Sequence, residues 1–202
     1  MLILTSYGFR SPIVSEKLKN IIDPKGKTVL IVPFAGFNNE SCARRETEGL
    51  IEFGFAADSI FVYDKEVPEN NKRADYIFVP GGNTFKLLYE ARQCGALEVI
   101  GRMVEEGSAY IGASAGAELA TTNIEYVTML EDNNYELESF DALGFIDDVV
   151  IPHSDQREIP QLLKANRLAE PKRMPACIGN GSVFVYERNE WGRFTYADCI
   201  IN

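Results

Sequence analysis

The chain has 202 residues, of which 46% are hydrophobic and 25% are charged, and this composition suits one globular domain spanning residues 1–202. Lysine and arginine total 20 against 30 aspartates and glutamates, so the formal net charge is −10. Phosphate backbones and anionic membranes repel such a surface, and we therefore expect neither nucleic acid nor membrane as a partner. No apolar run reaches the ~20 residues of a membrane span, and "MLILTSYG" lacks the basic flank of a signal peptide. A cytoplasmic location is the expectation.

A metal site is not expected. The chain has one histidine and four scattered cysteines, Cys42, Cys94, Cys177 and Cys199, without a CxxC pair. A zinc site needs Cys and His ligands at characteristic spacings, which this pattern does not offer. We interpret the cysteines as ordinary, mostly buried thiols.

Short apolar runs alternate with amphipathic stretches, the pattern of an α/β fold with a mainly parallel sheet and helices on both faces. In the first half, strands are expected at 1–5, 27–35, 59–64 and 74–80, and helices at 11–22, 38–55, 83–93 and 96–107. A strand, a sharp turn and a helix follow over 109–120, and 121–144 is loop-rich. A strand at 147–153, a helix near 157–169 and short antiparallel strands at 174–179, 182–188 and 193–201 complete the chain.

Ser114 lies in "GASAG", residues 112–116, between an apolar run and helix-forming residues. G-x-S-x-G is the pattern of a nucleophile elbow, in which small neighbours let strand and helix backbones approach closely. The amide of the next residue, Ala115, at the helix N-terminus, can then point at a developing oxyanion. Alternatively, Ser114 is only a small residue in a tight turn.

His153 ends the apolar strand "DDVVIPH". A serine hydroxyl needs an adjacent base, and open α/β sheets place catalytic groups at strand ends. As the chain's only histidine, His153 is the predicted base; the alternative is a satisfied or surface histidine.

Paired glycines follow the strand in "VPGGNTFKLL", residues 79–88. Such a pair allows backbone amides to approach a ligand, so Gly81 or Gly82 is a candidate second oxyanion donor. The alternative is a plain glycine turn with Asn83 or Thr84 capping the helix. A phosphate loop is excluded because no G-K-[ST] follows.

These three motifs, with "IPHSD" as the histidine segment, resemble the peptidase E (aspartyl dipeptidase) and cyanophycinase family of serine peptidases over most of the chain. The resemblance implies a fold like that of class I glutamine amidotransferases and cofactor-free hydrolysis of small peptides. It also implies roles for Ser114 as nucleophile, His153 as base, and amides near Gly82 and Ala115 as oxyanion hole. Known members remove an N-terminal aspartate from short peptides or cut β-aspartyl-arginine dipeptides from a polymer.

The sequence departs from the family at Asn180, in "CIGNGSVF", where the family has a glutamate that completes the triad. An asparagine can orient the histidine ring but cannot stabilise an imidazolium with charge. Asp155 or Asp132 could support His153 instead, and Asn180 could be a plain turn residue.

Asn83, Arg157 and Arg167 are the candidate substrate contacts. The arginines are named because a guanidinium grips an aspartyl carboxylate in a fork, and the alternative is that each is a solvated surface charge. Arg10 and Arg44 are more distant options. Glu118 is expected to be an exposed helical glutamate, or else to meet a substrate amine. A non-peptidase acyl hydrolase (esterase or amidase) and a catalytically impaired binding protein remain alternatives, and a homodimer is compatible with the sequence.

Overall fold

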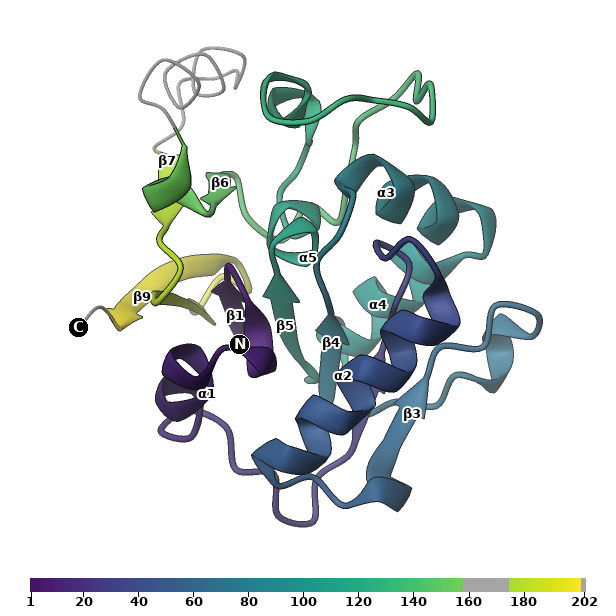
Figure 1. Ribbon diagram of the computed structural model, residues 1–202, viewed down its shortest axis with the longest axis vertical. Helices are drawn as coiled ribbons and strands as arrows, with labels where there is room; N and C mark the ends of the chain where they lie inside the picture. Colours follow the sequence, from purple (N-terminus) through teal and green to yellow (C-terminus); the bar gives the residue numbers. More distant parts are fainter. Residues whose placement is uncertain (158–174, 201–202) are drawn as a thin grey trace.

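The computed structural model describes residues 1–157 and 175–200, and its main feature is a seven-stranded sheet (Figure 1). The strand order is β3-β2-β4-β5-β1-β8-β9, in which the first five strands are parallel and β8 and β9 are antiparallel to their neighbours. The bounds are β1 Leu2–Thr5, β2 Val29–Ile31, β3 Ile60–Val62, β4 Tyr76–Val79, β5 Ala109–Ala113, β8 Val183–Arg188 and β9 Phe194–Ile200. The predicted α/β class is confirmed, with the antiparallel strands at the C-terminal end of the chain.

Helices cover both faces of the sheet because successive strand side chains point to opposite sides. On β1, Leu2 and Leu4 pack with α3, α4 and α5, whereas Ile3 packs with α1 and α2. The α-helices are α1 Pro12–Leu18, α2 Asn39–Phe53, α3 Thr84–Gln93, α4 Ala96–Glu105 and α5 Ala115–Leu119. Short 3-10 turns are η1 Gly8–Arg10, η2 Ala57–Ser59, η3 Pro68–Asn70, η4 Glu125–Met129 and η5 Ser154–Gln156. The three-layer arrangement thus follows from period-2 burial in the strands.

Two strands lie outside the main sheet. β6 (Val149–Pro152) and β7 (Pro175–Ile178) pair with each other in parallel, and Figure 1 shows them beyond the ends of β1 and β5. The expectation that 174–179 forms an antiparallel strand is therefore wrong. An apolar run of four residues shows that a strand forms, but not which strand it pairs with. The helix expected near 157–169 lies outside the described residues.

Two further expectations can be compared with the described residues. Within residues 1–157 and 175–200, no helix combines the length and apolar character needed to cross a bilayer. Cys42 is buried, but Cys94 and Cys199 are half-buried and Cys177 is exposed. The prediction of mostly buried thiols is therefore wrong.

Candidate active site

The parallel pairing of β4, β5 and β1 brings their carboxyl ends to one edge of the sheet. Thr5 is paired with Ala113, and Val79 with Gly112. The residues that directly follow these strands, including Ser114, are therefore neighbours. Open α/β sheets bind ligands at this kind of edge.

Ser114 occupies a sharp turn between β5 and α5, with the rarely populated dihedrals φ 51° and ψ −113°. Its neighbours must be small: a Cβ on Gly112 would lie 2.5 Å from the Gly116 carbonyl oxygen, and a Cβ on Gly116 only 2.0 Å from that of Val79. The Ser114 amide is fixed by a 2.9 Å hydrogen bond to the Thr5 carbonyl. Strained backbones of this kind cost about 1–3 kcal/mol and persist where the surrounding structure enforces them.

His153 follows β6 in a left-handed conformation (φ 55°), which directs its ring toward Ser114. The His153 Nε2 atom lies 3.0 Å from Ser114 Oγ. The edge of the Tyr7 ring packs on the imidazole, with ring centroids 4.8 Å apart. Two side chains that are 39 residues apart in sequence are thus within hydrogen-bond distance.

Asn180 contacts the other nitrogen of the same ring. Its Oδ1 lies 2.9 Å from His153 Nδ1, so the tautomer with a proton on Nδ1 donates to Asn180 and leaves Nε2 to accept from the serine hydroxyl. Asp155 does not contact the ring; its Oδ2 accepts a 3.0 Å hydrogen bond from the Asn180 backbone N–H. Asp132 has no contact with His153 in the part of the chain that the structure describes. Of the three residues considered as support for His153, Asn180 is the one that reaches it.

Ser6 links the chain segments that carry His153 and Asn180. Its hydroxyl, 2% exposed, donates to the Ile178 carbonyl at 2.9 Å and accepts from the His153 backbone N–H at 2.9 Å. It thereby joins the ends of β1, β6 and β7. Lys17 of α1 donates to the Gly181 carbonyl and holds the turn that carries Asn180. The sequence carries no signal for this role of Ser6, because it depends on strand ends more than 140 residues apart.

The glycine pair after β4 lies directly beside the serine. A Cβ on Gly81 would come within 2.8 Å of Ser114 Cβ, and one on Gly82 (φ 153°) within 2.0 Å of the Ala35 carbonyl oxygen. Among the described residues, no protein acceptor is hydrogen-bonded to the backbone N–H of Gly82 or of Ala115. Both amides are therefore free to bind an external oxygen.

Asn83 caps α3, because its Oδ1 accepts from the Lys86 backbone N–H at 2.8 Å. The Asn83 backbone N–H donates to the Ala35 carbonyl at 2.9 Å, and its side-chain amide donates to Glu131 at 3.0 Å. Both groups therefore anchor the glycine turn to surrounding segments.

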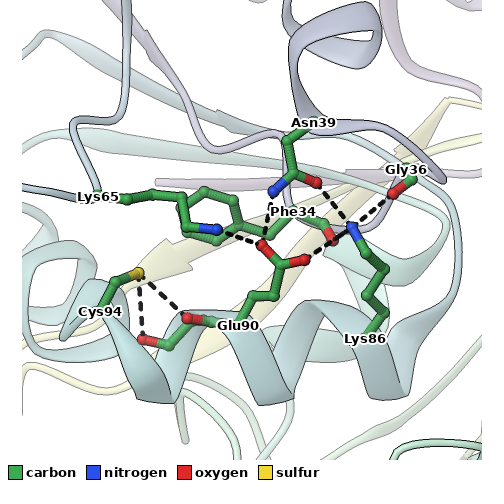
Figure 2. Close-up of polar contacts among 8 residues, drawn as sticks. Phe34, Gly36, Asn39, Lys65, Lys86, Glu90 and Cys94 are labelled. Carbon is green, nitrogen blue, oxygen red and sulfur yellow. Dashed lines mark hydrogen bonds and ion pairs between the residues drawn. The ribbon is translucent and has the colours of Figure 1, made fainter.

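Lys86 fastens the segment behind the glycine turn (Figure 2). Its ammonium donates to the carbonyls of Phe34 (3.0 Å) and Gly36 (2.6 Å) and to Asn39 Oδ1 (2.7 Å), and forms an ion pair with Glu90 at 2.9 Å. The Ala35 carbonyl, which accepts from the Asn83 N–H and lies against Gly82, is between the two bonded carbonyls in sequence. The loop after β2 is therefore held by α3 against the turn beside Ser114.

Glu118, one turn after Ser114, is buried, with 3% of its surface exposed. The Thr84 hydroxyl donates to its carboxyl group at 2.5 Å, and desolvation, together with the nearby Glu131, raises the pKa of Glu118 to about 8. The expectation of an exposed helical glutamate is therefore wrong. All five residues of α5 are buried, a placement that periodicity over five residues cannot reveal.

A small cavity of about 220 Å³ opens beside Ser114 and His153. It is lined by Ser6, Tyr7, Gly81 and Gly82, and also by Arg10, Arg45 and Glu46. Arg157 does not line it; its Nε donates to the Pro152 carbonyl at 2.9 Å. Arg167 lies outside the described residues. Within the described ranges, no group of three His, Cys, Asp or Glu side chains is arranged to hold a metal ion.

A serine, a histidine and a third polar group in hydrogen-bonded sequence, with free amides beside the serine, define the arrangement found in serine hydrolases of several unrelated folds. Comparison with known proteins narrows this class. The model of peptidase family S51 matches residues 2–187. The chain therefore belongs to this family and is a peptidase of the serine class.

Individual relatives agree with this family. An uncharacterized peptidase of Listeria monocytogenes is 31% identical over 149 residues, covering 70% of this chain and 71% of its own. Peptidase E of Salmonella arizonae is 33% identical over 129 residues, which are 63% of this chain but only 55% of that protein. A crystal structure of a candidate peptidase E from Listeria monocytogenes has a TM-score of 0.70 at 25% identity, covering 98% of this chain and 96% of the other. A peptidase from an acI-B1 actinobacterium shares the fold, with a TM-score of 0.66 at 20% identity.

Proposed function

We propose that this protein hydrolyses short peptides through an acyl-enzyme formed on Ser114, with His153 as the general base. The observation that carries the proposal is the 3.0 Å separation of Ser114 Oγ and His153 Nε2, at a strained strand-to-helix turn typical of a nucleophile elbow. In the first step, the serine oxygen attacks the scissile carbonyl carbon while its proton moves to Nε2. The same nitrogen then protonates the departing amine, and water hydrolyses the acyl-serine by the reverse sequence.

The tetrahedral intermediate would be stabilised by backbone amides of Gly82 and Ala115, with Gly81 shaping the turn between them and the serine. This assignment rests on the free N–H groups of these residues and on the position of Ala115 at the N-terminus of α5. Removing one oxyanion donor from a serine peptidase lowers kcat by about 10²–10³-fold, so the geometry of this turn would strongly affect the rate.

Asn180 would act by orienting the imidazole rather than by charge. Its Oδ1 accepts from Nδ1 and selects the tautomer in which Nε2 can accept the serine proton. The missing carboxylate is also the feature that favours a second candidate function, a binding protein with a catalytically impaired site. The test below separates the two.

The substrate class proposed is a dipeptide with an N-terminal aspartate or a similarly short peptide. Relatives named peptidase E share 31–33% identity with this chain, although it spans only 55–59% of their length. The cavity of about 220 Å³ is smaller than the ~300–1,000 Å³ of most ligand pockets, which supports a short substrate. A cytoplasmic location belongs to the same proposal, and the four free cysteines are compatible with it.

A fluorophosphonate probe and a dipeptide panel test the proposal. We expect the probe to label Ser114 in the wild type and not in Ser114→Ala, and His153→Ala to lower kcat/KM by at least about 10³-fold. An unlabelled wild type would overturn the catalytic proposal and leave the binding protein. Labelling without cleavage of any Asp-X or other dipeptide would remove the peptide substrates and favour an esterase or amidase.

A further inference from the structure

The cavity beside Ser114 has two arginines that the proposed catalytic steps do not use. Arg10 comes from η1, just after β1, and Arg45 from α2, after β2. Both line the cavity together with Ser114 and His153. They therefore reach the reaction site from two segments at the same sheet edge.

The buried carboxylate of Glu46 lies next to both guanidinium groups. Its side chain is 4% exposed, whereas those of Arg10 and Arg45 are 48% and 46% exposed. Glu46 Oε1 lies 2.8 Å from Arg45 Nη2, 2.9 Å from Arg45 Nε and 3.6 Å from Arg10 Nη1. Gly49, one turn further along α2, leaves room for the Arg10 side chain, because its missing Cβ would lie 3.5 Å from Arg10 Cγ.

The charges in this cluster do not balance. Two guanidinium groups face one carboxylate, so the group carries one net positive charge beside the nucleophile. Arg45 meets Glu46 with its Nε–Nη2 edge, and its Nη1 has no acceptor among the described residues; Arg10 has no partner there other than Glu46. Donors that are fixed by a buried carboxylate and still have free N–H groups are suited to a second, incoming carboxylate.

We propose that Arg10 and Arg45 form a subsite that binds a carboxylate of the peptide substrate. This inference rests on the proposed peptidase function and extends it, because it assigns residues to substrate charge. A short peptide offers two such groups, the C-terminal carboxylate and the side chain of an aspartate. Each of these two carboxylates can lie against the guanidinium pair while the scissile carbonyl lies at Ser114. Binding of either carboxylate would restrict the enzyme to small acidic substrates.

The test compares Arg10→Gln and Arg45→Gln with wild type on three dipeptides: Asp-Ala, Asn-Ala and the C-terminal amide of Asp-Ala. We expect each variant to lose roughly 10- to 100-fold in kcat/KM on the substrate that bears the bound carboxylate, and little on its amide counterpart. If kcat/KM falls on Asp-Ala and its amide but not on Asn-Ala, the arginines bind the aspartate side chain. If it falls on Asp-Ala and Asn-Ala but not on the amide, they bind the C-terminal carboxylate. If the wild type cleaves one of the amide substrates too slowly to measure, the variants are compared on the acid, where Arg10→Gln and Arg45→Gln must lose roughly 10-fold or more while Arg44→Gln loses nothing.

Arg44→Gln is the matched control, because Arg44 is the neighbour of Arg45 on α2, is exposed, and lines a different hollow. It should leave all three rates unchanged. The rate of fluorophosphonate labelling and the melting temperature report whether each variant keeps an intact site, and Arg45→Lys serves if Arg45→Gln does not fold. Equal losses on all substrates, or no loss, would overturn the subsite alone. A wild type that is labelled but cleaves no dipeptide would overturn the peptidase function and this inference with it.

Discussion

Asn180 offers the His153 ring a neutral oxygen at 2.9 Å, in a position where a carboxylate would also supply charge. A neutral acceptor selects the tautomer but does little for the imidazolium that forms when, in the proposed mechanism, His153 takes the serine proton. A carboxylate within about 4–6 Å favours a cation by roughly one to three pH units. The residue at this position should therefore set the strength of the base.

Replacing Asn180 by aspartate should accordingly move the acid limb of the kcat/KM profile to higher pH and raise the plateau by about tenfold, since one unit corresponds to about 1.4 kcal/mol. The check is a pH–rate profile on one dipeptide for wild type, Asn180→Asp and Asn180→Ala. Asn180→Ala should be slower than both, because it no longer fixes the ring. An Asn180→Asp profile that coincides with the wild type would show that this side chain does not act through His153.

At the scale of elements, the loop after β2 supports the turn of the proposed oxyanion hole, and Lys86 holds this loop in place. Three of its contacts are to that loop or to the start of α2, and its side chain is 12% exposed. Lys65 reaches the same Glu90 at 2.7 Å but is 39% exposed and makes no hydrogen bond to the loop. Instead, its ammonium lies over the Phe34 ring at 5.2 Å (Figure 2).

We expect Lys86→Met to destabilise the fold by about 2–4 kcal/mol, because two carbonyls lose their shared donor and the largely buried Glu90, still bonded to Lys65 and Asn39, loses one of its two cations. It should also lower kcat more than it raises KM, since a displaced Ala35 no longer supports Gly82. Urea unfolding and steady-state kinetics measure the two effects. Lys65→Met removes the same formal charge and should cost less than about 1 kcal/mol with kcat unchanged. Equal effects of the two variants on kcat would remove the special role of Lys86.

Elements also show what sequence patterns can and cannot predict here. "GASAG" and "VPGGN" were informative because local backbone geometry requires glycine at those positions, as the 2.0–2.8 Å clashes of added Cβ atoms demonstrate. The pairing of β6 with β7 and the cluster of Arg10, Arg45 and Glu46 were not predicted. Both depend on where separate segments meet, and the periodicity of each segment carries no information about its partner. Charge alone suggested Arg10 and Arg44 only as distant options; Arg10 lines the cavity, but on α2 it is Arg45 and not Arg44 that does so.

At the scale of the whole molecule, one ionisable group is buried between α5 and α3, within the larger hydrophobic core. Glu118 is covered by Thr84 and lies near Glu131, Arg157 and Tyr126. Burial disfavours its charged form, which raises its pKa from 4.5 in the unfolded chain to about 8 in the folded protein. Between these values the folded protein retains a proton that the unfolded chain has released.

The free energy of unfolding should therefore be highest below about pH 4.5 as far as Glu118 is concerned, and should fall as the pH rises toward 8, by at most about 1.4 kcal/mol per pH unit. Above pH 8 both states are ionised and this contribution to the slope ends.

Glu118→Gln has the same shape without the titration, so it should flatten the decline and be more stable than wild type at pH 8.5. Burial also raises the pKa of Glu131, which would leave a smaller residual slope. Urea unfolding between pH 5 and 9 measures these slopes, with exposed Glu125→Gln as the control that should follow the wild type. A Glu118→Gln slope equal to that of the wild type would mean that Glu118 is already ionised in the folded protein, and that the space between α3 and α5 accommodates a charge.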